Sequence, residues 1–506
     1  FPKEVEDWDI DRIVRNYADA AERMQAGGLD GIELEAYGHL LDQFWSPATN
    51  HRDDEYNGSL DNRLRFSWRV IDAIRERVGP DFVLGIRMVA DEDWEAGLSR
   101  EEGVEIARRM AASGKIDFLN LIRGHIDTDN ALADVIPVQG MRSAPHLDFC
   151  GEVRAETGFP VFHAAKIGDV ATARHAVAEG KLDMVGMTRA HMAEPHIVAK
   201  IMAGQEDDIR PCVGATYCLD RIYGGGEALC IHNPATGREL TMPHVISPAD
   251  ARRRVVVVGA GPGGLEAARV AAERGHDVTV FEAAGDPGGQ VRLATRTPRR
   301  REMIGIIDWR MAQCAARDVA FRFNTWAEAE DVTALDPDVV IVATGGLPNL
   351  ELLEQHGEAA HVISAWDVIA GDVTLSGSVL IYDESGDHPA LQAAEAALEG
   401  GAEVEVMTPD RTFAPEIMSM TLTPYIASLQ GHARFTLMQR LLEVRRAGNR
   451  LVARIGTDFS ERVEERAFDH VVVNYGTRPL DELYFDLREA SVNLGEVDHE
   501  ALIAGR

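Results

Sequence analysis

One strand–turn–helix segment constrains the fold of this chain more than any other. Residues 254–282 read as a Val-rich strand, a glycine turn, an Ala-rich helix and a second strand that ends at Glu282. The turn carries Gly259, Gly261 and Gly264. Such glycines let the backbone approach a pyrophosphate at the helix N-terminus, and the acid accepts hydrogen bonds from ribose hydroxyls. The segment predicts a Rossmann-like domain that binds FAD or ADP.

Two further signals follow this segment. The sequence Pro-Gly-Gly-Gln around Gly289 is typical of flavin-linked members of this fold. Residues 377–408 form a second strand–helix–strand pattern, but its turn, residues 383–388, has one glycine and three acidic residues. Carboxylates repel phosphate there, and Cβ atoms block its approach. We therefore expect a nucleotide-like domain that binds no NAD(P)H.

Helical stripes and short apolar strands alternate in the first 245 residues. Strands that recur with helices between them indicate βαβ units and a parallel sheet. Five such units without a glycine turn favour part of a (β/α)8 TIM barrel. The expected helices include 9–26, 60–78 and 101–113, and the expected strands are 30–34, 82–88, 118–122, 160–163 and 183–187.

Five strands cannot close a barrel of eight. An open remnant would expose strand edges and half of a core to water. Either three strands lie before Phe1 or the sheet is open, and we favour the first alternative.

A cysteine cluster follows these units. Three of the five cysteines, Cys212, Cys218 and Cys230, lie within 19 residues. Four thiolates normally hold a [4Fe–4S] cluster. Ala215 stands where a further cysteine would complete a C-x2-C-x2-C run, and alanine cannot bind iron. The spacing predicts an iron–sulfur loop with one ligand replaced.

Three alternatives remain open for this loop. A cluster could take its fourth ligand from His232 or Asp220, or contain three irons. A structural zinc ion could be held by the three thiolates and His232. The cysteines could also pack as small apolar side chains without any metal.

Charge limits the partners of the chain. Lys and Arg number 51 and Asp and Glu number 83, which gives 506 residues a net charge of −32. Such a chain is not built to neutralise phosphates, so we expect neither nucleic acid nor an anionic membrane as a partner. The sequence has no window of 18 uninterrupted apolar residues and no signal peptide at its start. We therefore expect a cytoplasmic protein.

Residues 30–66, DGIELEAYGHLLDQFWSPATNHRDDEYNGSLDNRLRF, resemble the Old Yellow Enzyme barrel. The resemblance is to the branch that contains trimethylamine dehydrogenase and 2,4-dienoyl-CoA reductase. The order of barrel units, cysteine loop, glycine turn, degenerate βαβ and the segment NYGTRP is similar to that branch over essentially the whole chain. Relative to the family, segments before Phe1 and after Arg506 are expected to be missing.

The resemblance implies five parts. The C-terminal part of an FMN-binding TIM barrel is followed by an iron–sulfur-type loop and two Rossmann-like nucleotide-binding domains. The last segment returns to the first of these. The expected boundaries are 1–204 for the barrel, 205–248 for the cysteine loop, 249–370 for the FAD- or ADP-binding domain, 371–466 for the degenerate NAD(P)-binding-like domain and 467–506 for the returning segment.

The resemblance also assigns FMN contacts to residues at the ends of expected strands. Arg87 matches the arginine that faces the N1–C2 carbonyl region of the flavin. Lys166, Gly168 and Arg189 match the turns after the last two strands, where barrels of this kind hold phosphate.

Catalytic residues are expected after the same strands. Where the family has H-x-A-H-G-Y-L-L, this chain has EAYGHLL, one residue shorter. Tyr37 and His39 are expected to face the flavin and to orient or deprotonate a substrate, and His125 is a further candidate.

Three other side chains are possible contacts for a cationic substrate. Glu35 could bind a cationic substrate nitrogen. Trp45 and Tyr56 could cage a methylated ammonium, but we expect them to pack in the core.

The resemblance implies flavin-dependent oxidative N-demethylation. FMN would take a hydride equivalent from an N-methyl carbon, and the iminium would hydrolyse to formaldehyde and a demethylated amine. Electrons would leave through the cluster to an electron-transfer flavoprotein or similar acceptor. The segments GATYC and CIHNPATGRE also resemble N-methylproline demethylases, so we expect a small methylated amine or amino acid of the N-methylproline or dimethylglycine type, and a homo-oligomer.

Two alternatives stay open. One is an NAD(P)H-dependent enoate or 2,4-dienoyl-CoA-type reductase, which the acidic turn at 383–388 disfavours. The other is a non-catalytic scaffold whose barrel binds no FMN.

Overall fold

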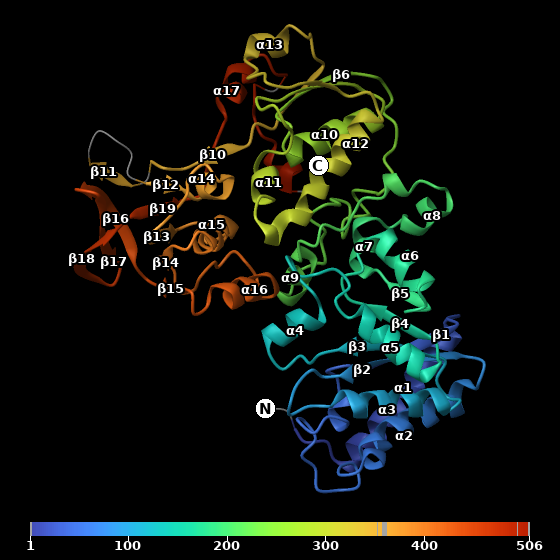
Figure 1. Cartoon of the computed structure of the whole chain (residues 1–506). Coiled ribbons are helices and arrows are strands. Elements are labelled where there is room, and N and C mark those ends of the chain that lie inside the picture. Colours follow the sequence, from blue (N-terminus) through green and yellow to red (C-terminus); the bar gives the residue numbers. More distant parts are fainter. Residues whose placement is uncertain (1–2, 352, 357–361, 493, 504–506) are drawn as a thin grey trace. The chain divides into compact units, whose positions relative to one another are not determined.

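The computed structural model describes residues 3–351, 353–356, 362–492 and 494–503. The chain forms two compact units, Phe1–His191 and Met192–Arg506 (Figure 1). This division falls earlier than the predicted domain boundary after residue 204. The cysteine loop and both Rossmann-like domains therefore belong to the second unit.

A five-stranded parallel sheet forms the centre of the first unit. Its strands lie side by side in chain order, β1 (Gly31–Ala36), β2 (Val83–Asp91), β3 (Phe118–Arg123), β4 (Val161–Ala164) and β5 (Met184–Gly186). The helices of this part are α1 (Asp7–Ala26), α2 (Leu60–Val78), α3 (Arg100–Ala112), α4 (Asp129–Val135), α5 (Leu147–Thr157), α6 (Val170–Ala178) and α7 (Thr188–Ala193), with the 3-10 helix η1 (Asp42–Phe44). All five predicted strands are present, which confirms the alternating α/β prediction.

Local sequence sets where these helices begin. The Ser59 hydroxyl accepts a hydrogen bond from the Asn62 N–H at the start of α2, and Ser99 does the same for Glu102 at α3. Such caps satisfy N–H groups that a helix leaves unpaired in its first turn. The carboxyl ends of the strands lie at one edge of the parallel sheet, and the predicted site residues follow them.

The first Rossmann-like sheet of the second unit is parallel, in the order β8-β7-β6-β9. Its core is formed by Val255 and Val257 of β6 together with Leu265 and Ala268 of α10. The strands are β6 (Arg254–Val258), β7 (Asp277–Phe281), β8 (Ala320–Arg322) and β9 (Val339–Val342). The helices are α10 (Pro262–Glu273), α11 (Gly289–Ala294), η3 (Pro298–Ile304), α12 (Gly305–Ala315) and α13 (Ala329–Thr333), preceded by α8 (Ile197–Met202), η2 (Glu206–Asp208) and α9 (Tyr217–Tyr223).

The second Rossmann-like sheet has the order β12-β19-β13-β14-β15 and is also parallel. Its strands are β12 (Ile363–Ser364), β13 (Ser378–Asp383), β14 (Glu403–Met407), β15 (Ala433–Thr436) and β19 (His470–Asn474), with helices α14 (Ala365–Ala370), α15 (His388–Glu399) and α16 (Ser419–Leu429). The predicted second strand–helix–strand pattern is confirmed by β13, α15 and β14.

A further sheet was not predicted. It contains β11 (Glu354–His356) and the antiparallel strands β16 (Arg440–Ala447), β17 (Arg450–Thr457) and β18 (Ser460–Phe468). Val444 and Ile455 of this sheet share a buried apolar cluster with Tyr382 of β13. The meander thus covers part of the second Rossmann-like sheet.

The last segment serves both Rossmann-like domains. Segment 467–506 was expected to return to the first Rossmann-like domain. Its first strand, β19, instead lies within the sheet of the second domain. After it, β20 (Thr477–Pro479) pairs with β10 (Gly346–Pro348), and Leu483 of α17 (Glu482–Arg488) packs in the core of the first domain. The final described helix is α18 (His499–Ile503). Within the described ranges, no helix combines the length and apolar character that a membrane crossing requires.

Candidate functional site

Three polar side chains lie in register across the first sheet. Glu35 on β1 pairs with Arg87 on β2, and Arg87 pairs with Asn120 on β3. Arg87 Nη1 lies 3.9 Å from Glu35 Oε2, and the Arg87 guanidinium lies 5.6 Å from the centre of the Tyr37 ring. Burial raises the pKa of Glu35, and the Arg87 charge opposes this rise.

Several buried polar atoms of these strands lack hydrogen-bond partners among the described residues. They are Glu35 Oε1, Arg87 Nε, Asn120 Oδ1 and His163 Nε2. The Nδ1 atom of His163 lies 2.7 Å from the Leu121 carbonyl, and burial lowers its pKa to about 4, so Nε2 of the neutral ring is an acceptor. The Arg87 donor and the acceptors of Glu35 and Asn120 lie on one face of the sheet. They fit a flat ring that offers both carbonyl oxygens and an N–H, as the flavin of FMN does.

The predicted phosphate residues lie after β4 and β5. Lys166 has a positive φ of 53° and its ammonium donates a hydrogen bond to the Met141 carbonyl. The backbone at Gly168 is open, since a Cβ there would meet no atom within 4 Å. Arg189 is the second residue of α7 and its Nη1 donates to the Pro137 carbonyl at 2.8 Å.

A cavity of about 290 Å³ lies beside the ends of β1, β2 and β3. It brings together Tyr37 and His125, two of the expected catalytic residues. It also adds side chains that were not singled out from the sequence, among them Asp42, Glu92, Trp94 and Asp127. Glu92 and Trp94 come directly after β2, so the rule that singled out His125 after β3 would have found them too.

Stacking and hydrogen bonding fix His125. Its ring stacks on Trp94 with 4.5 Å between ring centres and an angle of 17°. The Asp127 N–H donates to Nδ1 of His125 at 3.3 Å. Because Nδ1 accepts this hydrogen bond, Nε2 is the ring nitrogen from which His125 can donate to a ligand.

Asp42 holds the turn after β1. Its carboxylate accepts hydrogen bonds from the N–H groups of Gly38 at 2.5 Å and His39 at 3.1 Å. Burial raises its pKa, the Gly38 N–H opposes the rise, and Glu92 adds to it. The side chain of His39 is exposed, its Nδ1 lies 2.7 Å from the Tyr37 carbonyl, and it does not line the cavity. The structure therefore groups Tyr37 with His125 and leaves His39 apart.

Trp45 and Tyr56 belong to the core, as expected. Trp45 is fully buried and donates from Nε1 to the Ser67 hydroxyl at 2.9 Å. Tyr56 packs against Phe44 and is buried too. Neither ring lines the described cavity.

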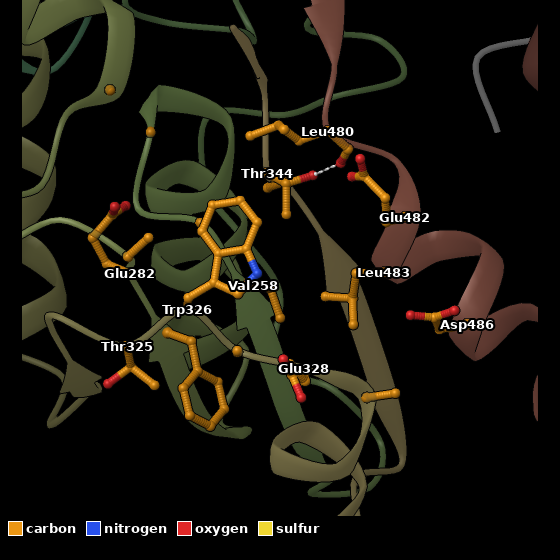
Figure 2. A pocket seen from close by; sticks show the side chains of 18 of the residues that line it. Val258, Glu282, Thr325, Trp326, Glu328, Thr344, Leu480, Glu482, Leu483 and Asp486 are labelled. Atoms are coloured by element: carbon orange, nitrogen blue, oxygen red, sulfur yellow. Dashed lines mark hydrogen bonds between the residues drawn. The ribbon is translucent and has the colours of Figure 1, made fainter.

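A second cavity, of about 710 Å³, lies at the glycine turn of the first Rossmann-like domain (Figure 2). Gly259, Gly261, Glu282 and Gly289, four of the residues expected to bind FAD or ADP, line it. A Cβ at Gly261 would meet nothing within 4 Å, so the backbone there is open to a ligand. Gly264 does not line the cavity; a Cβ there would lie 1.9 Å from the Gly259 carbonyl, so this glycine allows the helix to pack on the turn.

The far walls of this cavity were not predicted. Glu282 accepts hydrogen bonds from the Ala260 N–H at 2.7 Å and the Ala284 N–H at 2.8 Å. Through the first of these bonds it also stabilises the glycine turn after β6. Figure 2 shows the indole of Trp326 projecting into the cavity, with Leu483 and Asp486 of α17 on the other side. No motif or periodicity points to Trp326, because it lies in the loop between β8 and α13.

Hydrogen bonds of polar side chains stabilise the turn at residues 383–388, in the second Rossmann-like domain. Asp383 Oδ1 accepts from the Gly386 N–H at 3.0 Å. The amide of Asn474 on β19 donates to Asp387 Oδ1 at 2.8 Å. Burial raises the pKa of Asp383 to about 7.

The cysteine loop does not fit a metal centre as it is placed. Cys212, Cys218 and Cys230 are half-buried thiols. Over the described part of the chain, no group of three or more His, Cys, Asp or Glu side chains is positioned to hold a metal ion. Asp220, one predicted fourth ligand, instead accepts hydrogen bonds from Thr421 of α16. His232 is buried, with Nδ1 at 2.9 Å from the Pro211 carbonyl.

Two segments of the chain match known protein families. Residues 1–208 match the NADH:flavin oxidoreductase / NADH oxidase family, and residues 257–311 match the NAD(P)-binding Rossmann-like domain. A relative from Rhizobium meliloti (strain 1021), named "Probable N-methylproline demethylase", is 64% identical over all of this chain and 74% of its own length.

Two further likenesses extend over nearly the whole chain. An N,N-dimethylglycine/sarcosine dehydrogenase from Chromohalobacter salexigens is 43% identical over 99% of this chain and 74% of its own. The solved structure of a 2-naphthoyl-CoA reductase complex has a TM-score of 0.87 at 28% identity, covering 97% of this chain and 73% of that one. The chain therefore belongs to the NADH:flavin oxidoreductase / NADH oxidase family, the Old Yellow Enzyme family, and is an FMN-dependent oxidoreductase.

Proposed function

We propose that this chain catalyses the oxidative N-demethylation of a small methylated amine or amino acid, of the N-methylproline or dimethylglycine type. The cavity beside β1–β3 carries the proposal. Its lining combines the carboxylates of Asp42, Glu92 and Asp127 with the rings of Tyr37, Trp94 and His125. Carboxylates and aromatic faces attract a substituted ammonium ion. The names of the two relatives, a demethylase and a dimethylglycine/sarcosine dehydrogenase, support the same substrate class.

The side chains divide the work of binding. The carboxylates and Trp94 attract the cationic nitrogen, while His125, as a donor at Nε2, suits the carboxylate of an amino acid substrate. Glu35, Arg87 and Asn120 would hold the ring of FMN, and Lys166, Gly168 and Arg189 its phosphate. When bound, FMN supplies the oxidant that takes two electrons and a proton from the N-methyl carbon. Water then adds to the iminium, releasing formaldehyde and the demethylated amine.

We further propose that FAD or ADP occupies the cavity at Gly259–Gly264, and that reducing equivalents pass to an electron-transfer flavoprotein or similar acceptor rather than to NAD(P). The side chains that fill the 383–388 turn support this choice, because a pyrophosphate would meet carboxylates there. A homo-oligomer is proposed on the resemblance alone, and light scattering on the purified protein tests it.

The iron–sulfur cluster remains a separate proposal. It rests on three thiols in one loop, and Ala215 and the placement of these thiols argue against it. No electron-transfer step is assigned to it. Assays of iron, acid-labile sulfide and zinc distinguish a cluster, a structural zinc ion and metal-free thiols.

The experiment that tests the function is anaerobic mixing of the purified protein with dimethylglycine, N-methylproline, trimethylamine and NADPH in turn. We expect a methylated amino acid to bleach the flavin absorbance at about 450 nm and to yield formaldehyde. Glycine and proline, which lack the N-methyl group, serve as controls. Bleaching by NADPH alone would contradict the proposal.

A reductase is the second candidate, because the 2-naphthoyl-CoA reductase structure resembles nearly the whole chain. Such an enzyme oxidises NAD(P)H in the presence of an activated alkene. The same experiment separates the two functions, since a reductase is bleached by NADPH and reoxidised by an enoate.

A further inference from the structure

A third cavity, of about 580 Å³, lies in the second unit, away from the glycine turn. The segment from Ala193 to Arg210 forms one wall, and α10 and α12 form another. Its lining has four cationic side chains and three carboxylates, besides two histidines. An excess of positive charge is unusual in a chain whose net charge is −32.

Most of these cations are already neutralised. Lys200 lies 2.6 Å from Glu194. Arg269 lies 2.6 Å from Glu273, and Arg317 lies 3.2 Å from the same carboxylate. These pairs account for two of the three carboxylates of the lining.

Arg210 differs from the other three. Among the described residues, no carboxylate lies within 4 Å of its guanidinium, and no acceptor is hydrogen-bonded to it. Its Nε is buried without a partner, and the side chain is half-buried. Only its backbone N–H reaches a carboxylate, Glu194 Oε2, at 3.3 Å. A guanidinium that is partly removed from water without a hydrogen-bond acceptor retains N–H donors that an external anion can satisfy.

The buried indole of Trp309 orients the guanidinium of Arg210. Arg210 lies 4.3 Å from the ring centre of Trp309. The indole is buried and donates from Nε1 to the Asp208 carbonyl at 3.1 Å. A guanidinium stacked on an aromatic face keeps its N–H edge free to bind two oxygens of one anion.

We propose that this cavity binds a small molecule through an oxyanion group, a carboxylate or a phosphate, with Arg210 as the principal ligand. The site is separate from the cavity beside β1–β3 and from the nucleotide cavity. It does not depend on the demethylase proposal.

Calorimetric titration of the purified full chain with inorganic phosphate, and separately with citrate, tests the proposal. Sodium chloride at matched ionic strength controls for screening. We expect one of the two anions to bind, and Arg210→Gln to weaken that binding by about tenfold or more. The control Arg253→Gln removes an exposed cation outside the cavity and leaves the affinity unchanged.

Thermal unfolding separates binding from a structural role. Because Arg210 has no internal acceptor, Arg210→Gln should not lower the unfolding temperature of the ligand-free chain. Arg210→Lys keeps the positive charge but loses the paired N–H donors of the guanidinium, so it should bind the anion with intermediate affinity. This variant replaces Arg210→Gln in the test if the Gln variant does not fold. Binding of neither anion beyond the chloride control, or unchanged affinity in Arg210→Gln, would overturn the proposal.

Discussion

The side-chain amide of Asn474 donates a hydrogen bond of 3.0 Å to Oδ1 of Asp383. The two residues end the neighbouring strands β19 and β13. In a working dinucleotide domain the pyrophosphate binds at this edge of the sheet. Here the chain's own polar groups bind one another there, and this contact supports the proposal that the electron acceptor is not NAD(P).

Asp383→Asn should stabilise the protein at alkaline pH. The folded-state pKa of Asp383 is about 7, above the 3.8 of an unperturbed aspartate. The folded chain therefore binds more protons than the unfolded chain between these values, so this residue's contribution to stability falls as pH rises from 4 to 7. We expect the variant to raise the unfolding temperature by a few degrees at pH 8, with little difference at pH 4. Thermal scans at both pH values measure this; an equal shift at both would contradict it.

Three glycine variants test the nucleotide cavity. Gly264→Ala would place a Cβ 1.9 Å from the Gly259 carbonyl, so both stability and ADP binding should fall. Gly261→Ala meets nothing within 4 Å, so it should fold normally yet bind ADP about tenfold or more weakly, because the methyl group occupies the path of the pyrophosphate. Gly263→Ala is the control, with open space and no expected loss. Calorimetry with ADP supplies the affinities.

Arg87→Gln should reduce FMN retention. The buried Nε of Arg87 lacks a partner among the described residues, and we propose that a carbonyl of the flavin is its acceptor. We expect about a tenfold or greater rise in the FMN dissociation constant, measured by flavin fluorescence after dialysis. Arg15→Gln, an exposed change on α1, is the matched control. Full FMN content in Arg87→Gln would show that the arginine does not contact the cofactor.

Trp94→Ala should weaken substrate binding more than it slows the chemical step. The change removes an aromatic face from the cavity and the stacking partner of His125. We expect KM for the amine to rise about tenfold and kcat to change less, in steady-state assays with an artificial electron acceptor. Trp68→Phe, outside the cavity, provides the comparison. An unchanged KM would place the substrate elsewhere.

Strand-end residues were the predictable part of the site. Periodicity located β1–β5, and the rule that parallel strands end at one edge brought Tyr37, Arg87 and His125 to that edge. The fingerprint around Gly261 likewise predicted the nucleotide cavity, because local geometry alone requires those glycines.

The remainder depends on contacts between distant segments. Asn120 lies on the same face as Arg87 because of strand register, which a single sequence does not display. The His39 ring lies against the Tyr37 carbonyl, with Nδ1 at 2.7 Å from that oxygen, a contact that sequence spacing does not distinguish from a flavin contact. The sequence of β19 resembles that of β9. The sequence therefore does not show which sheet β19 joins, and the structure pairs it with β13 of the second sheet.

The wall of the nucleotide cavity formed by Leu483 and Asp486 has a consequence for biosynthesis. The glycine turn leaves the ribosome more than two hundred residues before that wall. A nascent chain can therefore assemble the β6–β9 sheet while its dinucleotide pocket is still open on one side. Tight capture of the nucleotide must wait until α17 has been made and has docked.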